Sequence, residues 1–423
     1  MNKSIFIFVI ILSLAFFSCK KIEMPTQPKE NIVDTVLSTS PLPQKEWTFL
    51  LYDDADWGKD AYDPLNDFSN SVSTNTDINY LVLRDGSNSE AACYEIGKHH
   101  EQELLENIGN IDMGNEKTLT NFIKLAKKYF PAKRYIAAFY DHGGGWTGVC
   151  GDVYNNISDE LEPYELDDAF KNTGGINIAI FTGACTMAAI ETAYQVRNSA
   201  KYYIASEDVS GYVYWYNMLD KFDALIKSNP SMTSEDLSKD IIALLYENSG
   251  NNPYGSTSEI TMSAIDLSKI QNFVSAFNLV TDYYMKNINK FRSLPKEEIK
   301  NYGDLIDVYD LLLVMRNYET DTSAIKIINN AMGYFNDCIV AECHGDSEVG
   351  SYGLSIYFPT NSAVIESTPD IYYTSDNAPL DFKNDCSWDK LVVRELEKSG
   401  VSPKKSSLQY MHKFNGFSPT YKN

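Results

Sequence analysis

The sequence predicts an α/β fold: a mostly parallel sheet flanked by helices, with a smaller and mainly helical C-terminal domain. In the first half of the chain, short apolar runs alternate with segments whose apolar residues recur at helical spacing. This alternation is typical of βαβ units, and continuous apolar runs suit parallel strands that are buried on both faces. From about residue 269 onward, helical periodicity dominates.

The expected strands are rich in β-branched and aromatic residues and end in small or polar ones. They cover residues 47–52, 78–83, 135–140, 178–181 and 202–205. Apolar residues at helical spacing predict intervening helices near residues 119–126, 166–170 and 187–196. The C-terminal region is expected to hold helices over residues 273–288, 302–317 and 324–338, and then a strand at 354–358.

Composition and charge narrow the function classes. The chain has 423 residues, of which 43% are hydrophobic and 22% charged, values ordinary for globular proteins. Its length leaves room for two or three domains. The formal net charge of −22 argues against a nucleic-acid partner, because phosphate contacts require clustered lysine and arginine side chains.

The N-terminus predicts a targeting segment. Lys3 precedes an apolar run over residues 5–17, which is shorter than the ~20 residues that span a membrane. The run ends in Phe-Phe-Ser-Cys, which resembles a bacterial lipoprotein cleavage box except that Phe16 stands where leucine is usual. We expect a signal peptide over residues 1–19 that ends at a lipidated Cys19. Plain secretion and an uncleaved anchor are the alternatives.

Two strand ends carry reactive side chains. The strand at 135–140 is followed by Asp141, His142 and three glycines, and the strand at 178–181 leads to Gly183, an alanine and Cys185. In open α/β sheets the chemistry lies beyond the carboxyl ends of the strands. A histidine and a cysteine that meet there form an activated-thiol pair. The alternatives are a satisfied turn histidine and a small buried cysteine.

Six segments in order give the chain a specific resemblance. It is similar to the clostripain-like cysteine peptidases, which have a caspase-like fold, and the likeness runs from near residue 47 to near residue 360. The matching segments are 47–56 (WTFLLYDDAD), 113–122 (MGNEKTLTNF), 131–146 (PAKRYIAAFYDHGGGW), 184–194 (ACTMAAIETAY), 261–267 (TMSAIDL) and 353–359 (GLSIYFP).

The resemblance implies an endopeptidase that works through an acyl-enzyme. His142 would be the general base and Cys185 the nucleophile. The backbone amides of Gly143 and Cys185 would form the oxyanion hole. Similar peptidases work with a dyad, so Asp141 is expected to be structural. A helix starting near residue 187 is expected to lower the pKa of Cys185.

Substrate preference is where the sequence departs from its relatives. Relatives that cut after Arg or Lys carry an aspartate two residues before the cysteine, where this chain has Gly183. The later run that should supply a second acid, around Val213, has no carboxylate, which leaves Glu207 and Asp208 as pocket candidates. Because burying an unpaired guanidinium costs several kcal/mol, we expect a P1 preference other than Arg or Lys.

No cofactor or metal is expected to be required. The stretch between His142 and Cys185 is rich in Asp and Glu, which predicts a solvated acidic loop; a Ca²⁺ site is the alternative, although no EF-hand spacing is present. The expected partners are a peptide or protein substrate and, through the lipid alone, the membrane. We expect a monomer in the bacterial cell envelope, at the outer membrane or cell surface.

The predicted organisation has four parts: the signal peptide over residues 1–19, a proline-containing flexible tether over 20–45, a caspase-like peptidase domain over 46–268 and a mainly helical domain over 269–423. A catalytically silent relative that binds peptide or glycan at the cell surface is the first rival. A transpeptidase or amidase that uses the same dyad is the second.

Overall fold

The structure is a computed structural model, and it describes most of the chain from residue 41 onward. The described residues are 41–55, 77–86, 89–96, 102–152, 159–210, 218–249, 257–359 and 380–396. The predicted signal peptide, Cys19, most of the tether and Val213 lie outside these ranges.

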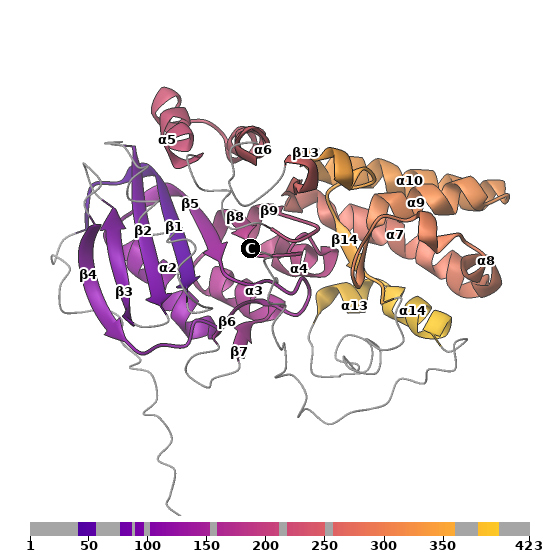
Figure 1. Ribbon diagram of the computed structural model, residues 1–423, viewed down its shortest axis with the longest axis horizontal. Helices are drawn as coiled ribbons and strands as arrows, with labels where there is room; N and C mark the ends of the chain where they lie inside the picture. The colour runs from indigo at the N-terminus through magenta and orange to yellow at the C-terminus, as the bar shows by residue number, and fades with distance from the viewer. Residues whose placement is uncertain are drawn as a thin grey trace, which may run out of the picture.

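A nine-stranded sheet forms the centre of the molecule, in the order β13-β10-β9-β8-β5-β1-β2-β3-β4 (Figure 1). The five central strands, from β9 to β2, run parallel. Both pairs of outer strands are antiparallel. The strands are β1 (Lys45–Ala55), β2 (Ile78–Gly86), β3 (Ser89–Ile96), β4 (Gln102–Gly109), β5 (Ala132–Tyr140), β8 (Ile176–Gly183), β9 (Ala200–Ala205), β10 (Thr261–Asp266) and β13 (Ile339–His344).

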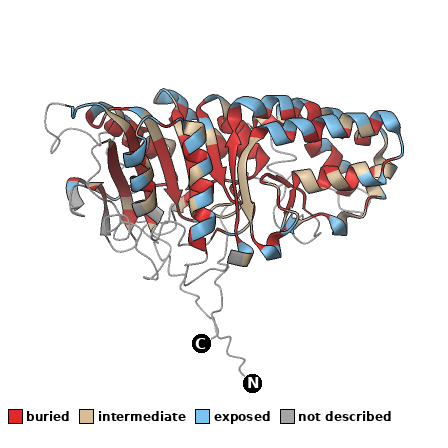
Figure 2. Cartoon of the chain, turned by 90° about the horizontal axis from the view of Figure 1, so that it is seen from above, coloured by how far each residue is buried: buried red, intermediate tan, exposed pale blue. Residues whose placement is uncertain are grey.

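Helices cover both faces of this sheet. One face packs on α2 (Glu116–Tyr129), α3 (Pro163–Asn172), α4 (Ile190–Gln195) and α7 (Leu267–Lys286). The other face packs on α5 (Met218–Ser228) and α6 (Ser234–Ser249). The strands are therefore buried while the outer surfaces of the helices are exposed, as Figure 2 shows. This arrangement explains why the central strands are continuous apolar runs.

The C-terminal region is rich in helix but shares the main core. It adds α8 (Ile288–Arg292), α9 (Val308–Tyr318), α10 (Thr322–Cys338), α13 (Asp381–Asp385) and α14 (Trp388–Leu396). A small sheet of β11 (Asn301–Tyr302), β12 (Leu305–Asp307) and β14 (Ser355–Tyr357) lies among them. One apolar cluster extends from Leu50 to Leu396, and β13 joins the main sheet. The division of the chain at residue 268 stays a prediction.

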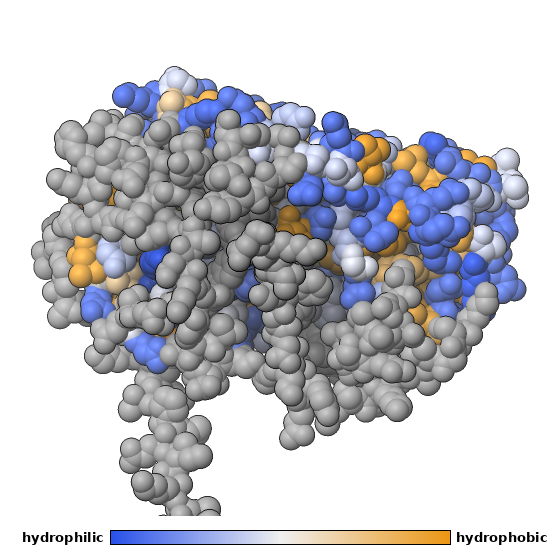
Figure 3. Space-filling model, in the orientation of Figure 1, coloured by the Kyte–Doolittle hydropathy of each residue, from blue (hydrophilic) through white to orange (hydrophobic). Residues whose placement is uncertain are grey.

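The surface of these C-terminal helices is mostly hydrophilic where Figure 3 shows it, with apolar side chains scattered singly. Leu279, Tyr318 and Tyr334 are among the exposed large side chains. None of the described helices is both long and apolar enough to cross a membrane.

The mostly parallel sheet flanked by helices confirms the predicted fold class, and all five predicted strands of the first domain are present. The sequence did not reveal β3 and β4, in which short apolar stretches are flanked or interrupted by polar and charged residues. A hairpin of β6 (Val149–Asp152) and β7 (Asp159–Leu161) was missed as well. The helix expected from residue 187 begins only at Ile190, after a stretch of turns.

Candidate active site

The site lies at the carboxyl ends of two neighbouring parallel strands. Tyr140, the last residue of β5, lies opposite Gly183, the last residue of β8. His142 and Cys185 each follow their strand by two residues. The sheet therefore delivers both side chains to the same edge, where ligands bind in open α/β folds.

Gly143 brings the histidine loop directly onto the cysteine loop. A Cβ atom at Gly143 would lie 2.5 Å from the carbonyl oxygen of Cys185 and 3.0 Å from its amide nitrogen. Real Cβ atoms do not approach a backbone so closely, so only glycine fits here. The backbone after His142 is thus in contact with the backbone of Cys185.

A hairpin turn holds the histidine loop. The amide of Gly144 donates to the carbonyl of Gly148 at 2.9 Å, and the amide of Cys150 donates to the carbonyl of His142 at 3.3 Å. The Gly143 amide has no acceptor among the described residues. The buried Asp141 accepts from the amide of Gly151 at 3.0 Å, which supports the structural role expected for it.

The cysteine loop is anchored by backbone hydrogen bonds from two other segments. The amide of Thr186 donates to the carbonyl of Asp208 at 3.0 Å, and the amide of Ala188 donates to the carbonyl of Ser206 at 2.8 Å. Like that of Gly143, the Cys185 amide has no acceptor among the described residues. The Cys185 thiol lies 4.0 Å from the carbonyl oxygen of Ser210.

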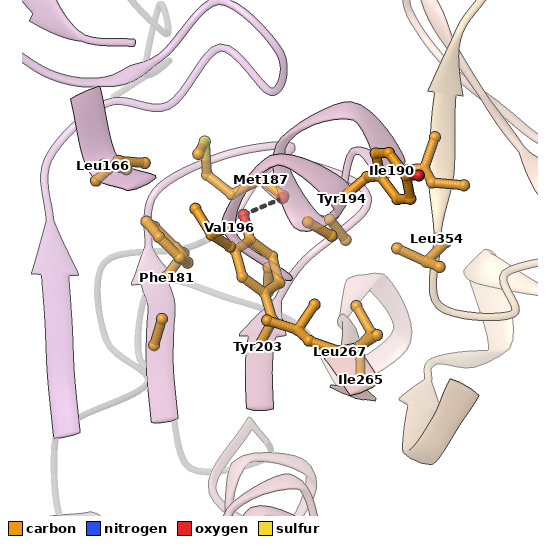
Figure 4. Close-up of a cluster of buried hydrophobic side chains, with 14 of the residues drawn as sticks. Leu166, Phe181, Met187, Ile190, Tyr194, Val196, Tyr203, Ile265, Leu267 and Leu354 are labelled. Atoms are coloured by element: carbon orange, nitrogen blue, oxygen red, sulfur yellow. Dashed lines mark hydrogen bonds between the residues drawn. The ribbon is translucent and has the colours of Figure 1, made fainter. Parts of the chain in front are cut away.

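Apolar packing against the core also holds the Cys185 loop in place. Figure 4 shows Met187 and Ile190 pointing into a cluster with Phe181 and Tyr203 from the strands. The Tyr203 hydroxyl donates to the carbonyl of Met187 at 2.7 Å. The loop that carries Cys185 therefore rests on packed side chains of the core.

A family model described as the clostripain family matches residues 53–398, which is most of the chain and includes both reactive residues. The chain belongs to the clostripain family. A curated relative, clostripain of Hathewaya histolytica, is 25% identical over 327 residues. That match covers 63% of this chain and 60% of the relative, so the chain matches about three fifths of the relative's length.

Solved structures show the same fold. A secreted C11 cysteine protease from Bacteroides thetaiotaomicron, in complex with an irreversible peptide inhibitor, superposes with a TM-score of 0.58 and 18% identity, over 81% of this chain and 99% of that one. An inactive zymogen C11 protease from Parabacteroides distasonis gives a TM-score of 0.58 and 17% identity, over 84% and 99%. The predicted caspase-like class is thereby confirmed.

Electrostatics favour neutral forms of both residues in this clostripain-family site. Burial lowers the pKa of His142, although its side chain reaches solvent at the site edge. Burial also raises the pKa of Cys185, and the negative charges of Asp208 and Asp141 raise it further. The hydrogen bond to the Ser210 carbonyl lowers this pKa in part. The expected lowering of the Cys185 pKa by a helix end is wrong, because α4 begins five residues later, at Ile190.

The pocket candidates are not equivalent. A Cβ atom at Gly183 would overlap the buried ring of Tyr140, so no side chain fits at position 183 without a shift of that ring. Glu207 is only 1% exposed, and its carboxylate accepts from the amide of Gly353 at 2.8 Å. Its burial argues against direct contact with a substrate, contrary to the pocket role expected from the sequence. Asp208 is half-buried beside the cysteine loop.

Metal binding stays a matter of prediction. Among the described residues, no group of three or more His, Cys, Asp or Glu side chains is arranged to hold a metal ion, and the six cysteines are unbonded. In the acidic crossover, burial and mutual repulsion raise the pKa of Glu160 and Glu162 to about 7. Residues 153–158 of this crossover lie outside the described ranges.

Sequence reasoning missed the residues that hold the Cys185 loop. Ser206, Ser210 and Ser355 contact the cysteine loop through their backbone atoms, and they come from segments far along the chain. Backbone contacts leave no signature in side-chain pattern. The only available signal was the Ser-Glu pair at residues 206–207 after β9.

Proposed function

We propose that this protein is a cysteine endopeptidase in which His142 and Cys185 form a catalytic dyad. The observation that carries the proposal is the contact between the Gly143 backbone and the Cys185 backbone, which joins the loops of the two reactive residues. Membership of the clostripain family supports the same chemistry.

The reaction begins from a neutral thiol and a neutral imidazole, the forms that burial favours. His142 takes the thiol proton as Cys185 attacks the peptide carbonyl, and the new C–S bond places a negative charge on the carbonyl oxygen. The amides of Gly143 and Cys185 stabilise this oxyanion. His142 then gives its proton to the leaving amine. Water, deprotonated by His142, hydrolyses the acyl-enzyme and restores the thiol.

The preferred P1 residue is proposed to be uncharged or small. Relatives that cut after basic residues have a carboxylate at the position of Gly183. In this chain the Tyr140 ring fills the space that such a side chain would enter. A buried guanidinium or ammonium group would then have no acid at that place, at a cost of several kcal/mol. Asp208, half-buried near Cys185, is the remaining candidate for an acid in the substrate pocket.

The protein is proposed to act in the bacterial cell envelope, exported by residues 1–19 and held by lipid on Cys19. The apolar run and its Phe-Phe-Ser-Cys ending support this location. A similar solved structure is described as a secreted protease. The expected substrate is a peptide or protein, and the expected state is a monomer.

A silent relative that binds peptide or glycan at the surface is the alternative, favoured by the raised pKa of Cys185. A transpeptidase would use the same acyl-enzyme and pass it to an amine.

One experiment separates these alternatives. The protein is treated with an iodoacetamide-type probe and with a panel of peptide acyloxymethyl ketones, and Cys185→Ala serves as the control. An endopeptidase is labelled at Cys185 by ketones with an uncharged P1 residue and hydrolyses the matching peptides. Alkylation by iodoacetamide without any ketone labelling would support a silent binding protein. Amine-dependent formation of new peptide bonds would support the transpeptidase.

A further inference from the structure

The cysteine loop forms a closed ring of hydrogen bonds with two other segments of the chain, residues 206–208 and 353–355. Residues 206–208 accept the amides of Ala188 and Thr186. The carbonyl of Ala188 accepts the amide of Ser355 at 2.9 Å. The ring closes through a side chain, because Glu207 accepts the amide of Gly353 at 2.8 Å. Glu207 lies between the two carbonyls that hold the loop.

A second buried carboxyl group completes this contact. Asp307, which is 0% exposed, lies beside Glu207 and interacts with it electrostatically, and Glu207 Oε1 is buried without a hydrogen-bond partner among the described residues. Asp307 also accepts the amide of Tyr352 at 2.7 Å and the amide of Asp310 at 2.6 Å. Tyr352 and Gly353 are adjacent, so the two carboxyl groups accept hydrogen bonds from neighbouring amides of the same segment. A hydrogen bond between two carboxyl groups requires a proton on one of them.

The groups around this pair are mostly acidic or neutral. Tyr302 on β11, Glu342 on β13, and Asp310 and Tyr352 on either side of Asp307 all interact electrostatically with the pair. Lys300 interacts with Asp208 and pairs with Glu348 at 2.7 Å. Burial and the neighbouring Asp307 raise the pKa of Glu207 well above its ordinary range. This direction and the buried, unpartnered Oε1 together point to Glu207 as the group that carries the proton.

We propose that Glu207 and Asp307 share one proton in a buried carboxyl pair that positions the Cys185 loop, and that loss of this proton at alkaline pH releases the loop. Glu207 is thus a positioning residue that acts through the backbone of residues 206–208. The inference rests on the proposed peptidase function for its catalytic readout, but the pair itself is testable without it.

The direction of the pH effect follows from proton binding. An unfolded carboxyl group ionises near pH 4, whereas burial keeps this pair protonated to higher pH. The folded state therefore binds more protons than the unfolded state, and its stability falls as the pH rises toward the raised pKa. Glutamine at 207 keeps a donor toward Asp307 and an acceptor toward Gly353 but cannot ionise.

The test compares Glu207→Gln, Glu207→Ala and a matched control, Asp223→Asn. Asp223 is also a buried carboxyl, but it lies on α5 under the opposite face and accepts from the Tyr80 hydroxyl at 2.9 Å. Three properties are measured for each protein: Tm from pH 6 to 10, hydrogen exchange of residues 184–190, and kcat/KM against pH.

The proposal expects the alkaline fall of Tm in the wild type to be reduced in Glu207→Gln and kept in Asp223→Asn. Glu207→Ala should raise exchange at residues 184–190 and lower kcat by about 10- to 100-fold with a smaller change in KM. Glu207→Gln should restore most of the neutral activity and remove the alkaline loss.

If Tm depends on pH in the same way in the wild type and in Glu207→Gln, the proposal of a shared proton is wrong. Normal exchange at residues 184–190 in both Glu207 variants would overturn the positioning role. If Glu207→Ala does not fold, the exchange and pH profiles of Glu207→Gln decide. If neither the wild type nor any variant hydrolyses peptides, the proposed function is wrong. Tm and hydrogen exchange still test the Glu207–Asp307 pair in that case.

Discussion

Gly143 shows how one residue couples the two halves of the candidate site. Its Cα lies against the Cys185 backbone, and its amide has no acceptor within the described residues. The close approach follows from the absence of a side chain, because a Cβ would separate the loops. The sequence indicated flexibility from three successive glycines, but only the structure identifies which of them makes the close contact.

Gly143→Ala should lower kcat by about 100-fold, since displacement of the histidine loop by a fraction of an ångström misplaces the base and the amide. Gly333→Ala is the matched control: this glycine lies within α10, a Cβ there meets nothing within 4 Å, and alanine should stabilise the helix by roughly 0.5–1 kcal/mol. Steady-state kinetics and thermal unfolding of both variants provide the check. Full activity of Gly143→Ala would contradict the close contact.

The pKa shift of His142 gives a second expectation for a single residue. Burial lowers this pKa, so the imidazole stays neutral and able to accept a proton at lower pH than an exposed histidine. The acidic limb of the kcat/KM profile should therefore lie below the ordinary histidine pKa of about 6.5. A pH-rate profile of the wild type measures it. An acidic limb above pH 7 would instead indicate an ion pair with a stabilised imidazolium.

The secondary-structure elements that the sequence revealed are those that are buried. The strands β1, β2, β5, β8 and β9 are buried on both faces, so their apolar runs revealed them and placed His142 and Cys185 at their ends. The outer strands β3 and β4 mix polar and apolar residues, and their pairing is a tertiary property. The start of α4 was misplaced because residues 184–189 form turns that are held by other segments.

The site was predictable as far as side chains project from local elements. The sequence predicted that His142 and Cys185 follow neighbouring strand ends, and the structure has them there; their catalytic roles and the structural role of Asp141 stay predictions. Glu207 was misread because its neighbours, Asp307 and Gly353, are 100 or more residues away in the sequence. Long-range contacts of this kind decide whether a carboxyl group faces the substrate or the interior.

For the whole molecule, the shared core bears on the predicted domain division. The β13 strand pairs with β10, and the cluster beneath the cysteine loop includes Leu267 and Leu354 (Figure 4). Residues 46–268 expressed alone should therefore fail to fold, because they lose the edge strand β13 and α7, which covers part of one face of the sheet. Circular dichroism and proteolysis of this fragment, beside residues 41–423, test this. A cooperative unfolding transition of the fragment would contradict it.

The predicted envelope location depends on Cys19. Mass spectrometry of protein extracted from the cell envelope should show a diacylglyceryl-modified Cys19 as the first residue, and Cys19→Ala should remain unprocessed or leave the membrane fraction. An unmodified chain that starts elsewhere and accumulates in the medium would contradict the lipid anchor.

The most direct test of the proposed dyad is peptide hydrolysis by the wild type, Cys185→Ala, His142→Ala and the double variant, measured on a substrate with an uncharged P1 residue. The wild type should cleave the peptide, and each single variant should lose measurable activity while its Tm stays within a few degrees. Because the pair acts as a unit, the double variant should be no worse than either single one. A wild type that cleaves no peptide, or a Cys185→Ala variant that keeps full activity, would contradict the account.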